Sequence, residues 1–198
     1  MTHAPRELLS RSQRHATILQ GAATAFATKG FASTAMEEVA AASGITKEIV
    51  YRHFASKEEL YRAVLDGAAQ RMQVEFARAQ QASESGAGIR ALLAVGRVQP
   101  DALRLLLVHA AREPEFADYA HDVRTRAINW ALQRRGHDDP LFRRWAAEVA
   151  MSHIRDAVLT WLDIGDPARD EEFARRCFAG VNALWGAWNA PVEWGSGE

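Results

Sequence analysis

Residues 36–60 read MEEVAAASGITKEIVYRHFASKEEL, and this stretch decides the fold of the N-terminal part of the chain. Gly44 permits the left-handed backbone of a tight turn between two short amphipathic segments. Ala40 is small enough for two helices to cross closely, and Ile45 and Val50 are spaced to fill the angle between them. The stretch therefore predicts a helix-turn-helix, the arrangement that presents its second helix to a DNA groove.

The segment 46–54 predicts the second helix of the pair. Because Val50 and Phe54 are four residues apart, both face the core, and the lysine, tyrosine and arginine around them face outward. An outward face of this kind is typical of a surface that grips phosphates. The alternative is an ordinary amphipathic helix with a solvated face, since Glu48, Glu58 and Glu59 reduce the positive potential of this surface.

Almost every other segment has the helical period, and glycine and proline fall between the segments rather than inside them. No stretch alternates as a half-buried strand does, so the predicted fold class is all-α with about nine helices. We expect two domains, a DNA-binding domain over residues 1–56, with its helix-turn-helix at about 34–54, and a helical domain over residues 57–198. The expected helices cover about residues 10–28, 35–42, 47–54, 56–82, 89–95, 101–112, 114–135, 140–163 and 169–188.

Bulk composition limits the function without identifying it. The 198 residues carry 24 basic and 25 acidic side chains, so the net charge of −1 does not by itself indicate a nucleic-acid partner. The single cysteine, Cys177, excludes an internal disulfide and fits a reducing compartment. Apolar runs are too short to cross a bilayer, so we expect a soluble cytoplasmic protein with no membrane partner.

Catalytic and metal-binding motifs with a recognisable spacing are not found. The pair His153 and Asp156 shares a helix face but has no companion at the spacing of a metal site such as HExxH. Cys177 lies in an apolar helical stripe, which is a poor environment for a nucleophile. We therefore predict no catalytic residue, no metal and no cofactor, although an all-α enzyme stays a third hypothesis.

An ordered, gap-free run over residues 15–65 resembles the N-terminal domain of the tetracycline-repressor-like (TetR) family of regulators. The run contains Lys29-Gly30-Phe31, Met36-Glu37-Glu38-Val39-Ala40 and Ser43-Gly44-Ile45-Thr46-Lys47, and its most specific part is YRHFASKEEL at residues 51–60.

The resemblance implies a homodimer that binds a pseudo-palindromic operator in double-stranded DNA. It also implies that a lysine, a tyrosine and a histidine of the second helix, and the lysine that begins the next helix, contact phosphates or base edges. Arg6, Arg11 and Arg14 lie before or in the first helix, where an arm would reach a neighbouring groove. The predicted DNA-binding residues are Thr34, Thr46, Lys47, Glu48, Tyr51, Arg52, His53 and Lys57.

Three residues, at two places in the run, depart from the family pattern. Ala35 stands where a capping serine or threonine is common, and Thr34 with Glu37 would form a capping box one residue earlier. Glu48 and Ile49 stand where small or hydroxylated residues are common. A carboxylate is unfavourable beside phosphate but accepts a hydrogen bond from a cytosine amino group, so this pair predicts an unusual target sequence.

The last two long segments carry wide apolar stripes at helical spacing, which favour an intermolecular four-helix bundle between two copies of the chain. The alternative is that the stripes line the core of a single chain. The predicted dimer-interface residues are Trp145, Val149, Trp161, Phe173, Cys177, Val181, Leu184 and Trp188.

The helices between would supply a pocket for a small-molecule effector, which needs apolar walls and a few inward polar groups. An aromatic stripe at helical spacing is also compatible with ordinary core. The predicted pocket residues are His109, Arg112, Phe116, Tyr119, Val123, Arg126, Trp130 and His153. They lead to the hypothesis of a dimeric repressor that a small apolar or aromatic effector releases from its operator. The alternative is a helical small-molecule-binding protein whose DNA-binding motif is vestigial.

Overall fold

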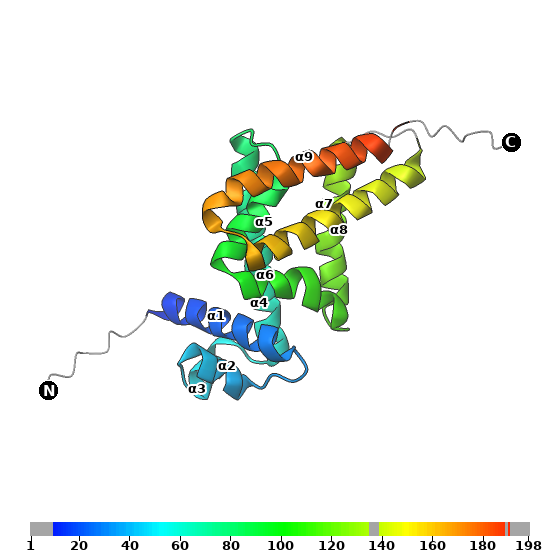
Figure 1. The fold of residues 1–198 in the computed structure, drawn as a ribbon. Helices are drawn as coiled ribbons and strands as arrows, with labels where there is room; N and C mark the ends of the chain where they lie inside the picture. The colour runs from blue at the N-terminus through cyan, green and yellow to red at the C-terminus, as the bar shows by residue number, and fades with distance from the viewer. Residues whose placement is uncertain (1–9, 135–138, 189, 191–198) are drawn as a thin grey trace. The chain divides into compact units, whose positions relative to one another are not determined.

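The computed structural model describes residues 10–134, 139–188 and 190, and the regular structure in these residues is helical, with no strand (Figure 1). The predicted all-α class is confirmed, as are nine α-helices in the described part of the chain. They are α1 (Arg11–Lys29), α2 (Met36–Ser43), α3 (Lys47–His53), α4 (Lys57–Gln81), α5 (Ala87–Val98), α6 (Pro100–Arg104), α7 (Ala117–Arg134), α8 (Pro140–Ile164) and α9 (Asp170–Trp188).

The helix expected over residues 101–112 is wrong as a single element. After α6 the chain forms a π-helical turn, Leu105–His109, and then a 3-10 turn, Ala110–Arg112. The amide of Ala110 donates to the carbonyl of Leu105, five residues earlier. The wider turn places Leu105 and Ala110 on one buried face, whereas a regular α-helix would turn His109 towards that face.

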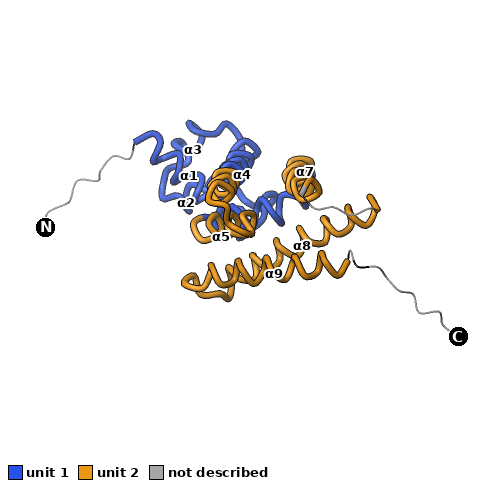
Figure 2. Tube along the Cα trace, turned by 90° about the horizontal axis from the view of Figure 1, so that it is seen from above, with its two compact units in different colours: residues 1–70, 99–117 blue, residues 71–98, 118–198 orange. Residues whose placement is uncertain are grey.

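The chain divides into two compact units, coloured separately in Figure 2. Unit 1 comprises residues 1–70 and 99–117, and unit 2 comprises residues 71–98 and 118–198. Unit 1 therefore contains the first half of α4 and the segment after α5, in addition to the three N-terminal helices. The boundary expected after residue 56, between a DNA-binding part and a helical part, stays a prediction.

Unit 1 is built around α1, which begins with a capping box. The hydroxyl of Ser10 accepts from the amide of Gln13 at 3.2 Å, and the Gln13 side chain accepts from the amide of Ser10 at 2.7 Å. The helix ends at Gly30, whose φ of 81° favours glycine. These signals fix the length of α1, against which α2 packs.

An aromatic cluster fills the core of unit 1. Tyr61 packs edge-on against Phe26, with ring centroids 5.0 Å apart, and Phe31 and Phe116 complete the group. All four side chains are at most 5% exposed. The cluster ties the loop after α1 to α4 and to the segment before α7, all within unit 1.

Unit 2 contains α8 and α9, which lie side by side and antiparallel in both views (Figures 1 and 2). The carboxylate of Asp139 begins α8 by accepting from the amide of Leu141 at 2.7 Å. Buried residues from α5, α8 and α9, among them Ile89, Val158 and Ala174, form one part of its core. In the described residues, no helix is both long and apolar enough to cross a membrane.

Candidate nucleic-acid interface

The turn between α2 and α3 has the geometry that the sequence predicts. Gly44 has φ 63° and ψ 27°, the left-handed conformation in which other side chains are strained. The amide of Ile45 donates to the carbonyl of Ala40, and the amide of Gly44 donates to that of Ala41, both at 3.1 Å. This double closure is a Schellman motif, and it sets the angle at which α3 leaves α2.

The two faces of α3 are as predicted. Val50 is fully buried and Phe54, just after the helix, is 3% exposed, so both anchor α3 to the core. Lys47, Tyr51 and Arg52 are exposed, and 45% of the Tyr51 side chain is in solvent. Unit 1 therefore presents a helix face with two cations and a phenol, and DNA contact by this face stays a prediction.

Lys47 pairs with Glu37 of α2, and its ammonium lies 5.6 Å from the centre of the Tyr51 ring. The hydrogen bond to Glu37 is the main cause of a raised pKa for Lys47 and, reciprocally, of a lowered pKa for Glu37. Both side chains are about half exposed, so the pair is solvated and adds little to stability. A phosphate oxygen can therefore replace Glu37 as the partner of Lys47 at small cost.

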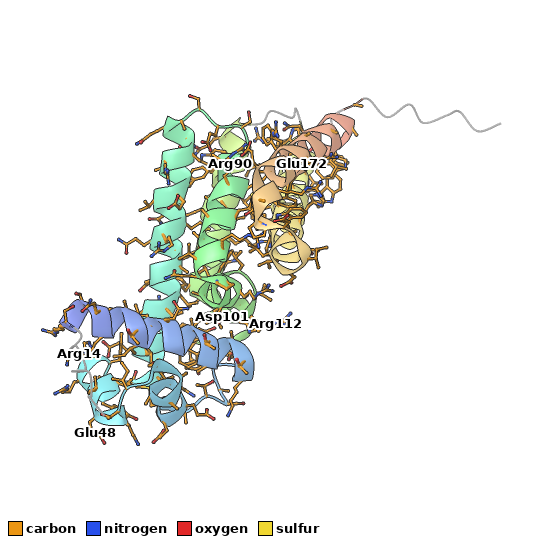
Figure 3. All side chains as sticks on the ribbon, turned by 60° about the vertical axis from the view of Figure 1, so that its left-hand side comes forward. Arg14, Glu48, Arg90, Asp101, Arg112 and Glu172 are labelled. Carbon is orange, nitrogen blue, oxygen red and sulfur yellow. The ribbon has the colours of Figure 1, made fainter. Side chains whose placement is uncertain are left out.

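Glu48 points into solvent at the exposed end of unit 1 (Figure 3). A hydrogen bond from the side chain of Thr46 is the first cause of its lowered pKa, so the carboxylate is ionised. The Thr46 hydroxyl does not cap α3. Both residues reach the surface as predicted, and an ionised Glu48 there is the reason to expect an unusual target sequence.

Thr34 is placed differently from the sequence prediction. It is 2% exposed, and its hydroxyl donates to the carbonyls of Gly30 at 2.7 Å and Ala25 at 3.3 Å. A buried hydroxyl that is satisfied inside the protein cannot contact DNA, so this prediction is wrong. The capping box with Glu37 is also wrong: α2 begins after Ala35, whose amide donates to the Glu38 carboxylate at 2.9 Å.

Lys57 is anchored inside unit 1 rather than extended towards solvent. Its ammonium donates to the carbonyls of Phe31 at 2.9 Å and Ala32 at 3.2 Å, and it lies 4.6 Å from the centre of the Phe31 ring. These contacts hold the loop between α1 and α2 against the start of α4. The third ammonium proton stays available, so a phosphate contact by Lys57 remains a prediction.

We expect Lys57→Met to lower the free energy of unfolding by about 1 kcal/mol, because the two carbonyls lose a charged donor. Methionine keeps the apolar stem on the Phe31 ring. The measurement is urea denaturation followed by circular dichroism. Lys29→Met is the control, since its ion pair with Glu38 is exposed, and an equal loss in both variants would contradict the anchoring role.

His53 lies in a basic surrounding, of which the sequence analysis named Arg11 and Arg14 but missed His15. The ring of His15, on α1, stacks on Phe54 at 5.1 Å and lies 5.9 Å from the ring of His53. Burial first, and then the charges of His15, Arg11 and Arg14, lower the pKa of His53. Arg11, Arg14 and His15 share one face of α1 at spacings of three and four, and this spacing could have identified His15. Arg6 lies outside the described residues.

The predicted polar groups of an effector pocket do not point inward. Arg112 of unit 1, and Arg126 and His153 of unit 2, are exposed, because a charged group without a buried partner stays in water. Phe116 belongs to the aromatic core of unit 1. His109, Tyr119 and Trp130 are half-buried and Val123 is buried, each within its own unit.

Each unit has a hollow at its surface. The hollow in unit 1 measures about 40 Å³, room for little more than a water molecule, and lies beside Val64 and Ala102. The hollow in unit 2 measures about 420 Å³ and is open to solvent along α8, beside His153, Trp161 and Phe173. Neither encloses a space in which an effector would be removed from water.

The predicted dimer-interface residues fall into two groups. Cys177 and Val181 are buried in the core of unit 2, so their placement at an interface is wrong, and the alternative of a monomer core holds for them. Trp145 and Leu184 are 44% and 38% exposed. Trp161 stacks on Phe173, with ring centroids 4.8 Å apart, Trp188 packs against Trp145 at 5.0 Å, and Val149 is half-buried.

The sequence prediction missed three exposed apolar residues on α8. Leu141, Phe142 and Ile164 are 73%, 52% and 81% exposed. Leu141 and Phe142 precede Trp145 by four and three residues, within about one turn of α8, whereas Ile164 is the last residue of the helix.

Comparison with known proteins places the N-terminal helices in a family. Residues 18–64 match the family described as bacterial regulatory proteins, tetR family. The chain is 40% identical over 57 residues to the transcriptional activator FasR of Mycolicibacterium smegmatis, covering 29% of this chain and 26% of FasR. It is 43% identical over 56 residues to the transcriptional repressor Rv3405c of Mycobacterium tuberculosis, covering 28% of this chain and 30% of the repressor. The matches thus span less than a third of either relative.

Solved structures share the fold over most of the chain. A TetR-like transcriptional regulator from Rhodococcus sp. RHA1 aligns with a TM-score of 0.74 at 18% identity, covering 90% of this chain and 99% of that one. The regulator AibR, solved with isovaleryl coenzyme A and operator DNA, aligns with a TM-score of 0.60 at 20% identity, covering 90% of this chain and all of AibR. Residues 18–64, which contain the helix-turn-helix of α2 and α3, thus match the TetR family of bacterial regulatory proteins, and the solved structures share the fold of most of the chain.

Proposed function

We propose that the chain is a TetR-family regulator, a dimeric repressor that binds a pseudo-palindromic operator and leaves it when a small apolar or aromatic effector binds. The exposed face of α3, with Lys47, Tyr51 and Arg52 on a helix anchored by Val50 and Phe54, carries the proposal. Such a face supplies phosphate contacts along a major groove. A protein that acts on the bacterial chromosome works in the cytoplasm.

The direction of regulation is the finer part of the proposal. Of the two relatives described above, one is named an activator and the other a repressor, and the matches cover only 57 and 56 residues. A reporter gene behind the chain's own promoter region distinguishes the two. Deletion of the regulator raises expression if it represses and lowers expression if it activates.

Lys47→Met tests DNA binding directly. We expect weaker binding to every duplex and a salt dependence that falls by about one unit of slope per protomer, because one phosphate contact is lost. The measurement is gel shift or fluorescence anisotropy against salt concentration, with the promoter region next to its own gene. Arg78→Met is the matched control, since Arg78 is 82% exposed on α4, outside unit 1.

Absence of a salt-sensitive complex with any duplex would refute the regulator and favour the alternative, a small-molecule-binding protein with a vestigial motif. If the regulator is correct, Tyr51→Ala also weakens binding while the protein keeps its thermal stability, because Tyr51 is half exposed.

The dimer is proposed from the apolar surface on the outside of α8 and α9. Leu141, Phe142, Trp145 and Leu184 leave a larger apolar area in water than isolated surface residues do. A twofold axis would pair this surface with its own copy and form a four-helix bundle.

We expect Leu184→Glu to shift the dimer towards monomer by at least about tenfold in the dissociation constant, because two carboxylates would enter an apolar interface. Sedimentation equilibrium at micromolar concentration measures the shift. Val74→Glu is the control, since Val74 is 60% exposed on α4. A monomeric wild-type chain, or equal behaviour of both variants, would contradict the proposed interface.

We propose that the effector binds a conformation of the protein that differs from the one in this structure. A ligand of ordinary size needs a cavity of roughly 300 Å³ or more that buries it, which neither hollow provides. An effector that binds only an expanded conformation would shift the equilibrium towards that conformation and away from DNA. Thermal shift with fatty-acyl and aromatic carboxylic acids, followed by release of the bound duplex, tests this step.

A further inference from the structure

Five basic side chains gather where α1 meets the end of α3. Arg11, Arg14 and His15 come from α1, and Arg52 and His53 come from α3; we call them the α1–α3 basic cluster. Figure 3 labels Arg14 on α1. The imidazole rings of His15 and His53 are 5.9 Å apart, and His15 also stacks on Phe54 at 5.1 Å. The stack fixes His15 beside His53, although the two are far apart in sequence.

We propose that the α1–α3 basic cluster is a second phosphate-binding site, which holds a backbone phosphate of duplex DNA beside α3 and takes up a proton when the phosphate enters. The inference rests on the proposed DNA-binding function and adds a named role for His15 and a pH dependence. Lys47, at the start of α3, and Tyr51 form the first contact.

The arrangement of charges at the α1–α3 basic cluster favours binding of an anion. In the residues that the structure describes, no carboxylate pairs with Arg11, His15, Arg52 or His53. Positive charge on His15 and on the arginines, at these distances, disfavours the protonated form of His53 in the free protein. The lowered pKa of His53, caused by burial and by these neighbours, agrees with this.

Carboxylates on the neighbouring helices are already engaged elsewhere. Glu37 of α2 pairs with Lys47 at the start of α3. On α4, Lys57 binds carbonyls of the loop before α2, whereas Glu58 and Glu59 bond to the loop that precedes α4. These carboxylates of unit 1 are thus engaged away from the imidazole of His53, and a ligand anion would supply the negative charge that stabilises its protonated form.

A phosphate supplies this charge. It accepts hydrogen bonds from Arg11, Arg52 and the imidazolium of His53, and its approach raises the affinity of His53 for a proton. The proton comes from solvent, and no covalent bond is made or broken. By linkage, acidification from about pH 8 to about pH 6 must strengthen binding to DNA, by about tenfold for each unit of pKa change.

The probe is the tightest-binding duplex selected from a random-sequence library, labelled for anisotropy, with full-length protein in phosphate-free buffer at constant ionic strength. We expect wild-type affinity to rise about tenfold from about pH 8 to about pH 6. His15→Phe keeps a ring on Phe54 but binds no proton, so its affinity changes much less with pH. His15→Arg has a permanent charge and binds tightly at both values. His121→Gln, an exposed histidine of α7, is the control and keeps the wild-type dependence.

Titration of the imidazole NMR resonances provides a second measurement. If His15 had only a structural role, its substitution would not change the titration midpoint of His53. In the free protein the His53 midpoint lies below that of an ordinary histidine, rises in His15→Phe, and rises in the wild type when the duplex is added. Melting of each variant, followed by circular dichroism, confirms that it is folded.

The outcomes separate the two proposals. If no duplex is selected at any pH, the DNA-binding function is wrong, and this inference is wrong with it. Duplex binding whose pH dependence is the same in wild type and His15→Phe overturns only the inference. A rise of the His53 midpoint with inorganic phosphate at about 10 mM as large as that with the duplex also overturns it, because the site would then be a free-anion site.

Discussion

Gly21→Ala is expected to lower the free energy of unfolding by about 3 kcal/mol, at the upper end of what an overpacked core costs. A Cβ at this position of α1 would lie 2.2 Å from the Oγ of Ser43, 2.7 Å from its amide nitrogen and 2.8 Å from its Cα. The hydroxyl could rotate away only by breaking its 2.7 Å bond to the carbonyl of Val39. The two backbone atoms cannot rotate at all, so α2 has to move away from α1.

The same displacement would reach α3, because Ser43 is the last residue of α2 and Gly44 sets the angle of the next helix. We therefore expect Gly21→Ala to weaken DNA binding as well as stability. Adding Ser43→Ala should recover only part of the loss, since the backbone contacts remain.

Urea denaturation followed by circular dichroism measures the stability of these variants. The control is Gly67→Ala on α4, also in unit 1, where no atom lies within 4 Å of the added Cβ. There alanine removes the conformational cost of glycine and should stabilise by up to about 1 kcal/mol. Similar effects of the two substitutions would show that α1 and α2 do not pack as closely as Gly21 and Ser43 indicate.

Local patterns made the helices and the faces of α3 predictable. The four-residue spacing of Val50 and Phe54 and the turn at Gly44 are local signals that involve four or five consecutive residues, so they can be recognised in a single sequence. Thr34 was misplaced because its hydroxyl bonds to the carbonyl of Ala25 in the preceding helix, a contact that local propensity does not contain. The π-helical turn after α6 was missed because it depends on which residues the core of unit 1 buries.

Longer-range packing decided the errors at the candidate sites. His15 and His53 meet only because α1 crosses the end of α3, so neither residue indicates the other in the sequence. On α9, Cys177, Val181 and Leu184 belong to one apolar stripe, yet the first two are buried and Leu184 is 38% exposed. Which side of the stripe is covered depends on where α8 lies, and periodicity alone does not determine that.

Asp170→Ala is expected to cost about 3 kcal/mol, because it leaves the charge of Arg97 half-buried without its partner. The Asp170 carboxylate begins α9 and accepts from the Nε of Arg97 at 2.9 Å, from its Nη2 at 2.7 Å and from the indole nitrogen of Trp161 at 2.6 Å. Less than a quarter of either charged side chain is exposed. One carboxylate thus joins α5, α8 and α9 in the core of unit 2.

The pH dependence of this loss has a definite sign. The hydrogen bonds from Arg97, and to a lesser extent from Trp161, lower the pKa of Asp170 despite its burial. A carboxyl whose pKa is lower in the folded state stabilises the fold fully above its unfolded value, about pH 4, and loses that stabilisation as the pH falls through the folded value. The difference between wild type and Asp170→Ala should therefore be full at neutral pH and shrink in acid below about pH 4.

Glu172→Ala provides the matched control in the same turn of α9. Glu172 also binds two arginines, Arg169 and Arg176, but those partners are 60% and 78% exposed and stay solvated when it is removed. Its loss should change the denaturation midpoint only slightly. If both variants lost the same stability at neutral pH, the half-buried position of Arg97 would not be the source of the effect. If the Asp170→Ala deficit persisted unchanged in acid, it would come from lost packing or helix capping rather than from the ionised pair.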